Sequence, residues 1–277
     1  MGHHFLPQHY LLGFADGVKL WGHDVGAGRS FRTQVKSLAN ETDMYTEDLE
    51  NHLANVVEGP AQGVIDRARK RLKLRDEDRE VFAAYVIAMW KRVPAGRKRV
   101  AGHIPELAET IKMRVVQQLD ALAASEPGLA EIASKRKEEV HRIISAYKEN
   151  PPDYFWHHAL KSGSTRRTVQ GLLSMDWHFL VSPGEDFITC DNPAFFFESM
   201  GIGASESELS FPLSSEICFW ANRANSNRPQ YFTTDRSIVL ELNRRSAHNT
   251  QRFIYTREEA PWVLGFAAKS HSLHRLS

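Results

Sequence analysis

The spacing of apolar residues changes character twice along the chain. Between about 46 and 176 they recur every three or four positions, which predicts a series of amphipathic helices. On both sides, and most clearly over about 177–260, short apolar runs alternate with turn residues, as is typical of strands. We therefore predict an α+β fold, in which the N-terminal and C-terminal segments form a mostly antiparallel sheet and a multi-helix block is inserted between them. A sheet built from both ends implies a single domain over 1–277.

Proline and glycine mark the helix boundaries. A helix is predicted over about 47–72, and Gly59-Pro60 should kink or restart it. Pro94 is predicted to stop the next helix. Two further helices, over 105–125 and 128–149, are separated by a Pro-Gly pair and are expected to form an antiparallel pair.

In the strand-rich part, two apolar runs at 177–181 and 187–190 flank a Pro-Gly turn, which predicts a hairpin. The segment after about 265 shows no such pattern and is expected to fray.

The composition is that of a globular protein. The chain has 277 residues, of which 42% are hydrophobic and 25% charged, so it contains enough apolar material for a core. It has neither an apolar run of about 18 residues nor a secretory signal, so no membrane segment is predicted. Its two cysteines, Cys190 and Cys218, are too few for a disulfide framework and suit buried thiols in a reducing cytoplasm.

Positive charge is concentrated in two stretches, although the net charge is only +1. Residues 66–100 hold 12 Lys and Arg against 5 Asp and Glu, and residues 223–257 hold 7 against 2. Such stretches bind nucleic acid or another polyanion in some proteins. In others, their side chains pair with acidic residues elsewhere in the molecule.

The opening of the chain places histidines, a Gln and a Tyr among apolar anchors. His3 and His4 are neighbours, so on a strand they face opposite sides and would not bind one metal together. In a loop they could do so. His4 with His9, or His3 with Asp191, are the better chelating pairs, which makes His4 and Asp191 candidate ligands of a divalent metal. Alternatively, a buried histidine orients this segment through hydrogen bonds.

A polar turn, Asp191-Asn192-Pro193, follows an apolar strand. Pro193 pushes Asn192 into an extended conformation, and Asp191 is presented at the strand end. A carboxylate in this place serves as a metal ligand or general base. In the alternative interpretation, it bonds to nearby backbone amides in an Asx-turn.

Four further residues suit a polar site. Glu50 and Glu58 lie eight residues apart, or about 80° around a helix, so they flank one face and suit acid–base work; the alternative is a solvated helix surface. Arg92 and Arg252 suit the clamping of a phosphate or carboxylate. Either arginine also suits a structural ion pair with Asp191 or Glu58.

Several of these motifs together resemble a mainly bacterial family, domain of unknown function 4238. The family typically opens with His-His-x-x-Pro-Gln-x-Tyr-Leu-x-x-Phe, which this chain matches from His3 to Phe14. The resemblance extends over nearly the whole chain and includes Tyr45 with the helix after it, the Trp90–Pro94 run, the Asp191 turn with its preceding strand, residues 211–214 and residues 249–255. It implies a map of site residues and no particular reaction.

Two functions fit these residues. The first is a hydrolase of an anionic substrate, such as a phosphodiester or nucleic acid. Its proposed groups are catalytic His3, His4, Gln8, Asp191 and Asn192, substrate-binding Tyr10, Arg92 and Arg252, and the acid–base candidates Glu50 and Glu58. The second is a non-catalytic binding or regulatory protein, in which the N-terminal motif and the Asp-Asn-Pro turn form a structural clasp. The chain has no Gly-x-Ser-x-Gly elbow, Walker loop, dinucleotide fingerprint or kinase signature.

Overall fold

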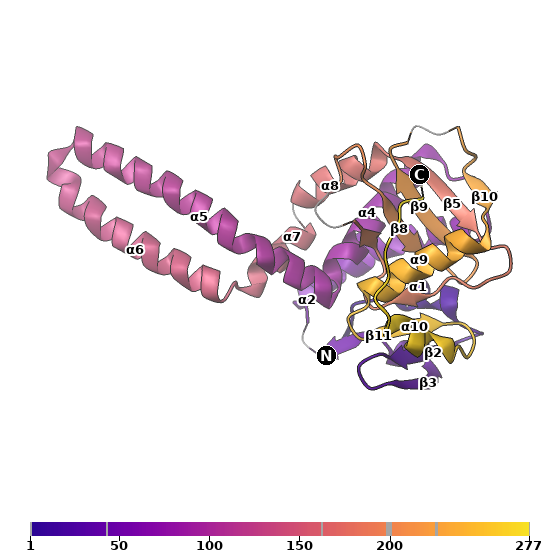
Figure 1. The fold of residues 1–277 in the computed structure, drawn as a ribbon. Coiled ribbons are helices and arrows are strands. Elements are labelled where there is room, and N and C mark those ends of the chain that lie inside the picture. Colours follow the sequence, from indigo (N-terminus) through magenta and orange to yellow (C-terminus); the bar gives the residue numbers. More distant parts are fainter. Residues whose placement is uncertain (1, 43, 162, 198–200, 225–226, 277) are drawn as a thin grey trace.

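The strands of the computed structural model form three sheets, and a long helical hairpin projects from the body that they build with the other helices (Figure 1). The structure describes residues 2–42, 44–161, 163–197, 201–224 and 227–276. The strands are β1 (Gly2–His4), β2 (Lys19–Asp24), β3 (Arg29–Gln34), β4 (Asn40–Thr42), β5 (Asp176–Val181), β6 (Thr189–Cys190), β7 (Phe195–Phe196), β8 (Leu209–Pro212), β9 (Ile217–Asn222), β10 (Tyr231–Thr233) and β11 (Phe253–Thr256).

The sheets confirm the predicted α+β class and its mostly antiparallel pairing. β1 pairs with β4, a four-stranded sheet has the order β3-β2-β11-β6, and a five-stranded sheet has the order β10-β5-β9-β8-β7. The four-stranded sheet joins strands from both ends of the chain, as predicted. The five-stranded sheet is built from residues after 175 alone, so the strands are divided between separate sheets, where one was expected. Its β10–β5 pair is parallel.

Most helices occupy the middle of the chain, one short helix lies near its start and two lie near its end. They are α1 (Gln8–Leu11), α2 (Glu47–His52), the π-helix Leu53–Glu58, α3 (Gly59–Arg69), α4 (Asp76–Arg92), α5 (Pro94–Ser125), α6 (Ala130–Glu149), α7 (Asp153–Lys161), α8 (Gly163–Leu173), α9 (Arg236–Asn249) and α10 (Trp262–Ala267). Short 3₁₀ turns cover Leu12–Phe14, Val35–Ser37 and Pro127–Leu129.

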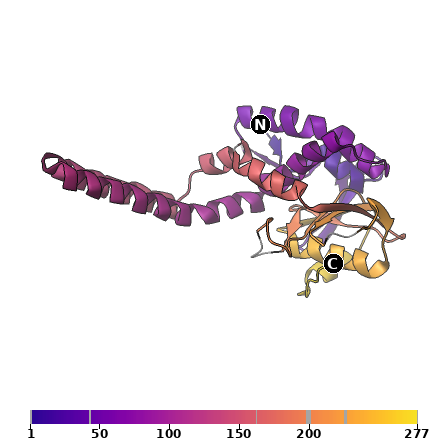
Figure 2. The same cartoon turned by 90° about the horizontal axis from the view of Figure 1, so that it is seen from above.

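The core has helices on both faces of the five-stranded sheet, with α4 on one side and α9 on the other (Figure 2). Phe82 of α4 packs edge-on against Phe219, with ring centroids 4.9 Å apart, and also contacts Phe179. The neighbouring Leu180 points to the opposite face and joins Val239 of α9 in a second apolar cluster. Both faces of β5 are therefore buried, which explains why apolar side chains stand on both of them.

The predicted strand hairpin was wrong, whereas the predicted stop at Pro94 is confirmed and the helix predicted over 105–125 begins at Pro94 instead. The runs 177–181 and 187–190 do not form a hairpin, because β5 is paired on both edges by β9 and β10 while β6 pairs with β11 in the other sheet. Pro94 ends α4 but also begins α5, which continues through Pro105 to Ser125. Proline is compatible with the first helical position because that residue's N–H has no partner within the helix.

The segment after residue 265 is held against the body and does not fray. The Arg245 guanidinium is fully buried, lies 2.7 Å from the Glu208 carboxylate and donates to the His274 carbonyl at 2.5 Å. Glu241 in turn accepts a hydrogen bond from the backbone N–H of His274. Buried charges of this kind are stable only when paired, so the tail completes a buried network.

Helices α5 and α6 form the predicted antiparallel pair and project from the body as an arm (Figures 1 and 2). Ion pairs between Lys148 and Glu109 and between Lys137 and Asp120 cross from one helix to the other. They set the register of the hairpin along most of its length.

Candidate functional site

The N-terminal motif is positioned by the small β1–β4 sheet. Within this sheet His3 lies opposite Glu41, and His4 lies opposite Asn40. The His3 side chain is buried, and its Nδ1 accepts a hydrogen bond from the Tyr45 amide at 3.2 Å. This hydrogen bond is the contact expected if a buried histidine orients the N-terminal segment.

His4 has a defined tautomer. Its Nδ1 lies 3.0 Å from the Leu38 carbonyl oxygen. Because a carbonyl only accepts, the proton is on Nδ1 and the other nitrogen, Nε2, carries a lone pair. The Gln8 amide nitrogen lies 3.3 Å from Nε2 and donates to it. Gln8 is exposed and His4 is partly buried, so the basic nitrogen lies beside the molecular surface.

A buried ion pair lies next to this histidine. The Arg92 guanidinium is 1% exposed, pairs with the Glu58 carboxylate and donates to the His4 carbonyl at 2.7 Å. The Tyr45 hydroxyl donates to the Arg92 carbonyl at 2.6 Å. Burial alone would lower the pKa of Arg92, but the adjacent Tyr45 and Glu58 raise it, so the guanidinium stays charged. Burial also raises the pKa of Tyr45 to about 12.

A π-helix positions the two glutamates. The turn Leu53–Glu58 takes more residues per revolution than an α-helix, and the Gly59 N–H bonds to the Ala54 carbonyl. This widening reduces the angle of about 80° that a regular helix would leave between Glu50 and Glu58. It also comes just before Pro60, whose ring and missing N–H disrupt a regular α-helix. Such π-turns occur frequently at functional sites.

Three buried polar atoms near the ion pair have no hydrogen-bond partner within the part of the chain that the structure describes. They are Glu50 Oε2, Arg92 Nε and the Tyr85 hydroxyl. Burial, followed by the charge of Glu58, raises the pKa of Tyr85 well above its usual range. Unpaired buried polar atoms are rare in folded proteins and mark strain, catalysis or ligand binding. We call His4, Gln8, Glu50, Glu58 and Arg92 the N-terminal polar cluster.

Asp191 belongs to a different group of contacts. Its Oδ1 accepts the Gln251 N–H at 2.8 Å, and its Oδ2 accepts those of Arg252 at 2.7 Å and Phe253 at 3.0 Å. Burial raises the pKa of the Asp191 carboxyl, and these three N–H donors oppose the rise. Because its oxygens are directed at the start of β11, the side chain fastens β11 to the end of β6. We call Asp191 and residues 251–253 the Asp191 clasp.

Asn192 extends the same connection. Its amide donates to the Asn249 carbonyl at 3.1 Å, and the Asn249 amide returns bonds to the carbonyls of Asn192 and Ala194. The Arg252 guanidinium points away from Asp191 and pairs with the buried Asp24 at 2.8 Å. Arg252 therefore contacts Asp191 through its backbone and Asp24 through its side chain.

Tyr10 joins the N-terminal segment to both larger sheets. Its hydroxyl donates to the Pro212 carbonyl at 2.9 Å and lies 2.6 Å from Thr189 Oγ1. The side chain is completely buried. The opening segment therefore packs against the strand that leads to Asp191.

Comparison with known families assigns the chain. Residues 2–260 match the model of a protein family of unknown function, DUF4238. The chain belongs to the DUF4238 family. Comparisons with curated proteins and with solved structures find no match.

The motifs that resemble the DUF4238 family fall into two groups in space. The N-terminal polar cluster draws on the opening run, the helix after Tyr45 and Arg92. The Asp191 clasp draws on the two C-terminal motifs.

Among the described residues, no three His, Cys, Asp or Glu side chains are grouped so that they could hold a metal ion. His4 and Asp191 consequently lack a third ligand of these types.

Most charges of the two basic stretches are engaged inside the molecule. All seven arginines of 223–257 contact an acidic side chain, a carbonyl or an aromatic ring. In 66–100, at least nine of the 12 basic residues do so. Eleven of the 19 basic side chains pair with an acidic side chain, as the ion-pair interpretation requires, and at least five others contact carbonyls or aromatic rings. The described helices of this DUF4238 protein include none with the length and apolar character needed to cross a membrane.

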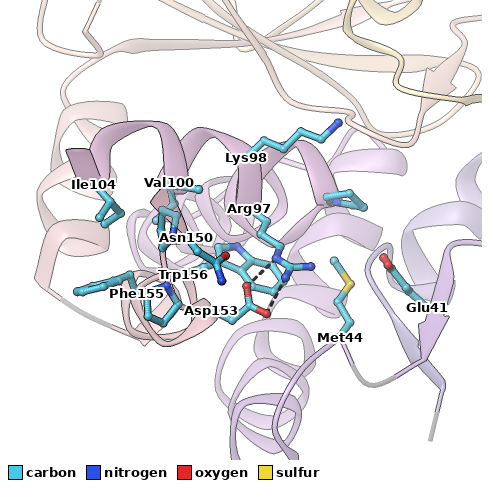
Figure 3. Close-up of a pocket in the computed structure, with 14 residues that line it drawn as sticks. Glu41, Met44, Arg97, Lys98, Val100, Ile104, Asn150, Asp153, Phe155 and Trp156 are labelled. Carbon is cyan, nitrogen blue, oxygen red and sulfur yellow. Dashed lines mark hydrogen bonds and ion pairs between the residues drawn. The ribbon is translucent and has the colours of Figure 1, made fainter. Parts of the chain in front are cut away.

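A separate cavity of about 470 Å³ opens at the base of the arm (Figure 3). Arg97 and Asp153 form a two-bond ion pair within it, with both distances 2.7 Å, and Trp156 and Met44 form part of its wall. None of the sequence-predicted site residues lines this cavity.

Two site residues carried no chemical signal in the sequence. Tyr85 lies on the apolar face of α4, where its position predicts only a core residue. Asn249 ends α9 and was noted only as part of a motif. Neither could be found from the sequence, because Glu58, whose charge acts on Tyr85, lies 27 positions away and the partners of Asn249 lie at least 55 positions away.

Proposed function

We propose that the protein is a hydrolase of a small anionic ester, such as a phosphoester, and that the N-terminal polar cluster is its active site. The observation that carries the proposal is the His4 tautomer. Nδ1 is bound to a fixed backbone carbonyl, and the unprotonated Nε2 lies near the surface beside an exposed amide. A general base needs a fixed orientation, which the Leu38 bond supplies, and a lone pair that meets the substrate, which the exposed Gln8 amide releases when it turns from Nε2 to the substrate.

The remaining groups of the cluster suit the other parts of a hydrolysis. His4 Nε2 removes a proton from water, whose oxygen attacks the ester centre. Glu50, whose Oε2 is buried and unpaired, passes a proton from the His4 imidazolium to the oxygen that leaves. The Gln8 amide stabilises the negative charge that develops, whereas the buried Arg92, which is paired with Glu58, fixes the His4 backbone through its bond to the His4 carbonyl.

In this proposal the Asp191 clasp is structural, and Asp191 and Asn192 take no part in chemistry. Three backbone N–H donors already occupy the Asp191 carboxylate. Tyr10 and Arg252 likewise have structural roles, since one is completely buried and the side chain of the other pairs with Asp24. The substrate is a small molecule, because most charges of the basic stretches are matched internally. We expect the enzyme to act in the cytoplasm.

The test is a hydrolysis assay on chromogenic phosphodiester, phosphomonoester and carboxylic ester substrates. We expect turnover of a phosphoester, and a loss of 10²-fold or more in His4→Asn, the usual contribution of a general base. Asparagine can still donate to the Leu38 carbonyl, so the melting temperature should change little. His141→Asn, at an exposed position on α6, is the matched control.

Either of two outcomes would overturn the proposal: no turnover of any ester, or equal turnover by the unmodified protein and His4→Asn. A polyanion partner is tested separately, by binding to DNA and RNA at two salt concentrations. Binding that weakens steeply with salt would support a nucleic-acid substrate in place of a small one.

A further inference from the structure

A further cavity, of about 610 Å³, lies where α4, α5 and α7 meet. Its volume falls within the range of about 300–1,000 Å³ that is usual for small-molecule sites. No member of the N-terminal polar cluster lines it, so a ligand bound here would occupy a separate site. Its walls are mainly apolar and include Trp90, Val100, Ile104, Leu107, Phe155 and Ala159.

The part of the wall that α5 supplies is one face of that helix. It consists of residues 96, 99, 100, 103, 104 and 107, which at about 100° per residue fall within roughly 140° of one another. At 1.5 Å per residue this face is about 16 Å long. Phe155, His158 and Ala159 of α7 line the cavity at the same helical spacing. The cavity is therefore elongated along α5, and its shape suits an extended ligand.

The two ends of this face differ in exposure. Lys91 and Gly96 are buried at one end, whereas Leu107 at the other end is 53% exposed. The buried end is tightly packed, because a Cβ at residue 96 would collide with the Lys91 carbonyl and only glycine allows this approach. Lys91 thus lies at the closed end of the cavity, and Leu107 lies at its mouth.

The cavity is lined by basic side chains and, among the described residues, by no Asp or Glu. The basic ones are Lys91, Arg99, His103 and His158. The Arg99 guanidinium lies over the Trp90 ring, 4.8 Å from its centroid. At the closed end, Lys91 Nζ donates to the carbonyl of Ala159 at 3.3 Å, and Ala159 itself lines the cavity. The ammonium group is therefore part of the cavity wall.

The Lys91 ammonium is a positive charge in apolar surroundings. Its side chain is 7% exposed, and burial lowers its pKa to about 8, so it is mainly protonated at pH 7. The Ala159 carbonyl accepts a hydrogen bond but carries no net charge. Burial of an ion is costly unless an opposite charge accompanies it. An anionic group at the closed end would supply that charge from the ligand.

We propose that this cavity binds the anion of a long-chain carboxylic acid, with the carboxylate at Lys91 and the hydrocarbon chain lying along α5 toward Leu107. The apolar walls then cover the chain, and the ammonium pairs with the carboxylate. A cationic amphiphile would be repelled by the basic lining. A neutral one would leave the charge of Lys91 uncompensated.

The test is calorimetric titration of the full-length protein with dodecanoate, dodecanol and dodecylammonium, each below the concentration at which it aggregates. We expect dodecanoate to bind, and dodecanol to bind about tenfold more weakly or worse, because a hydrogen bond between charged groups is lost. Dodecylammonium, which has the same chain and the opposite charge, should not bind.

Two variants locate the ligand. Lys91→Met removes the charge and keeps an unbranched side chain, so it should weaken dodecanoate about tenfold or more and leave dodecanol unchanged. Lys98→Met is its control, because Lys98 is exposed and does not line this cavity. Leu107→Glu places a negative charge at the mouth and should weaken both ligands. Its control is Met113→Glu, since Met113 is 54% exposed on the same helix and does not line the cavity.

Four outcomes would overturn the proposal. They are no binding of dodecanoate, binding of dodecylammonium as tight as that of dodecanoate, and unchanged affinity for dodecanoate in Lys91→Met or in Leu107→Glu. The fourth is equal affinity of the unmodified protein for dodecanoate and dodecanol, which would assign the cavity to a neutral apolar molecule. All of these measurements are independent of ester hydrolysis, so they test this site without reference to the proposed active site.

Discussion

The hydroxyl of Tyr10 lies 2.6 Å from that of Thr189, a residue 179 positions later in the chain. Since the Tyr10 proton is donated to the Pro212 carbonyl, the Thr189 hydroxyl donates to Tyr10. One side chain thus connects the opening motif to β6 and β8.

Tyr10→Phe should leave the Thr189 donor and the Pro212 acceptor without their partner in a buried place. We expect a loss of about 1–3 kcal/mol in the free energy of unfolding. Denaturant unfolding measures the change, with Tyr154→Phe as control because Tyr154 is 67% exposed. Equal losses in the two variants would contradict this role for Tyr10.

Asp191→Asn should destabilise the protein while leaving hydrolysis by the folded fraction unchanged. The new amide group would face a backbone N–H, so at least one of the three donors of residues 251–253 loses its acceptor. A cost of about 1–3 kcal/mol lowers the melting temperature by several degrees. Asp16→Asn, in an exposed ion pair with Arg32, is the control. An unchanged melting temperature with lost turnover would instead make Asp191 catalytic.

His23 should make folding sensitive to acid. It is buried between the hydroxyls of Ser30 and Thr256, each 2.8 Å away, and burial lowers its pKa to about 4. Between pH 4 and 6.5, the unfolded chain therefore binds the additional proton, so stability falls as the pH falls through this window. The contribution, at most about 3 kcal/mol, is fully present above pH 6.5.

The measurement for His23 is the free energy of unfolding at several pH values, in the unmodified protein and in His23→Gln. The variant should be less stable at pH 7 and should lose less between pH 6.5 and 4.5. Parallel curves for the two proteins would show that His23 does not titrate in this way.

Lys91 should produce a dependence of the same sign in alkali. Its side chain is 7% exposed and donates to the Ala159 carbonyl, and burial lowers its pKa to about 8. Between pH 8 and 10.5 the unfolded chain holds more protons, so stability attributable to Lys91 rises with pH. Below pH 8 the cost of the buried charge is constant. Comparing unfolding of Lys91→Met and the unmodified protein at pH 7.5 and 9.5 isolates this effect, and a pH-independent difference would contradict it.

Local patterns predicted the helices well because amphipathic periodicity is a property of neighbouring residues. The helix at Asp76 and the antiparallel pair before residue 150 are both found. Pairing of strands depends on residues far away, so the apolar runs at 177–181 and 187–190 suggested a hairpin although they belong to different sheets. Pro94 was ambiguous because proline suits both the end of one helix and the start of the next.

The site was predictable as a set of residues but not as an arrangement. His4, Gln8, Glu58 and Arg92 were all identified, and only tertiary packing shows that they are together while Asp191 is elsewhere. The sequence could not decide whether Arg92 clamps a substrate or forms an ion pair, because its partner, Glu58, lies 34 positions away. The π-turn before Pro60 was beyond the reach of sequence reasoning, since its outcome depends on how the helix packs.

The arm also has an evolutionary consequence. Its helices pair with one another in register, from Glu109 with Lys148 to Asp120 with Lys137. Adding or deleting whole turns in equal numbers on both helices would change its length while leaving Pro94 and Asp153 in place at its base. Relatives are therefore expected to tolerate long matched insertions and deletions here, whereas an unmatched change would shift the register and be selected against.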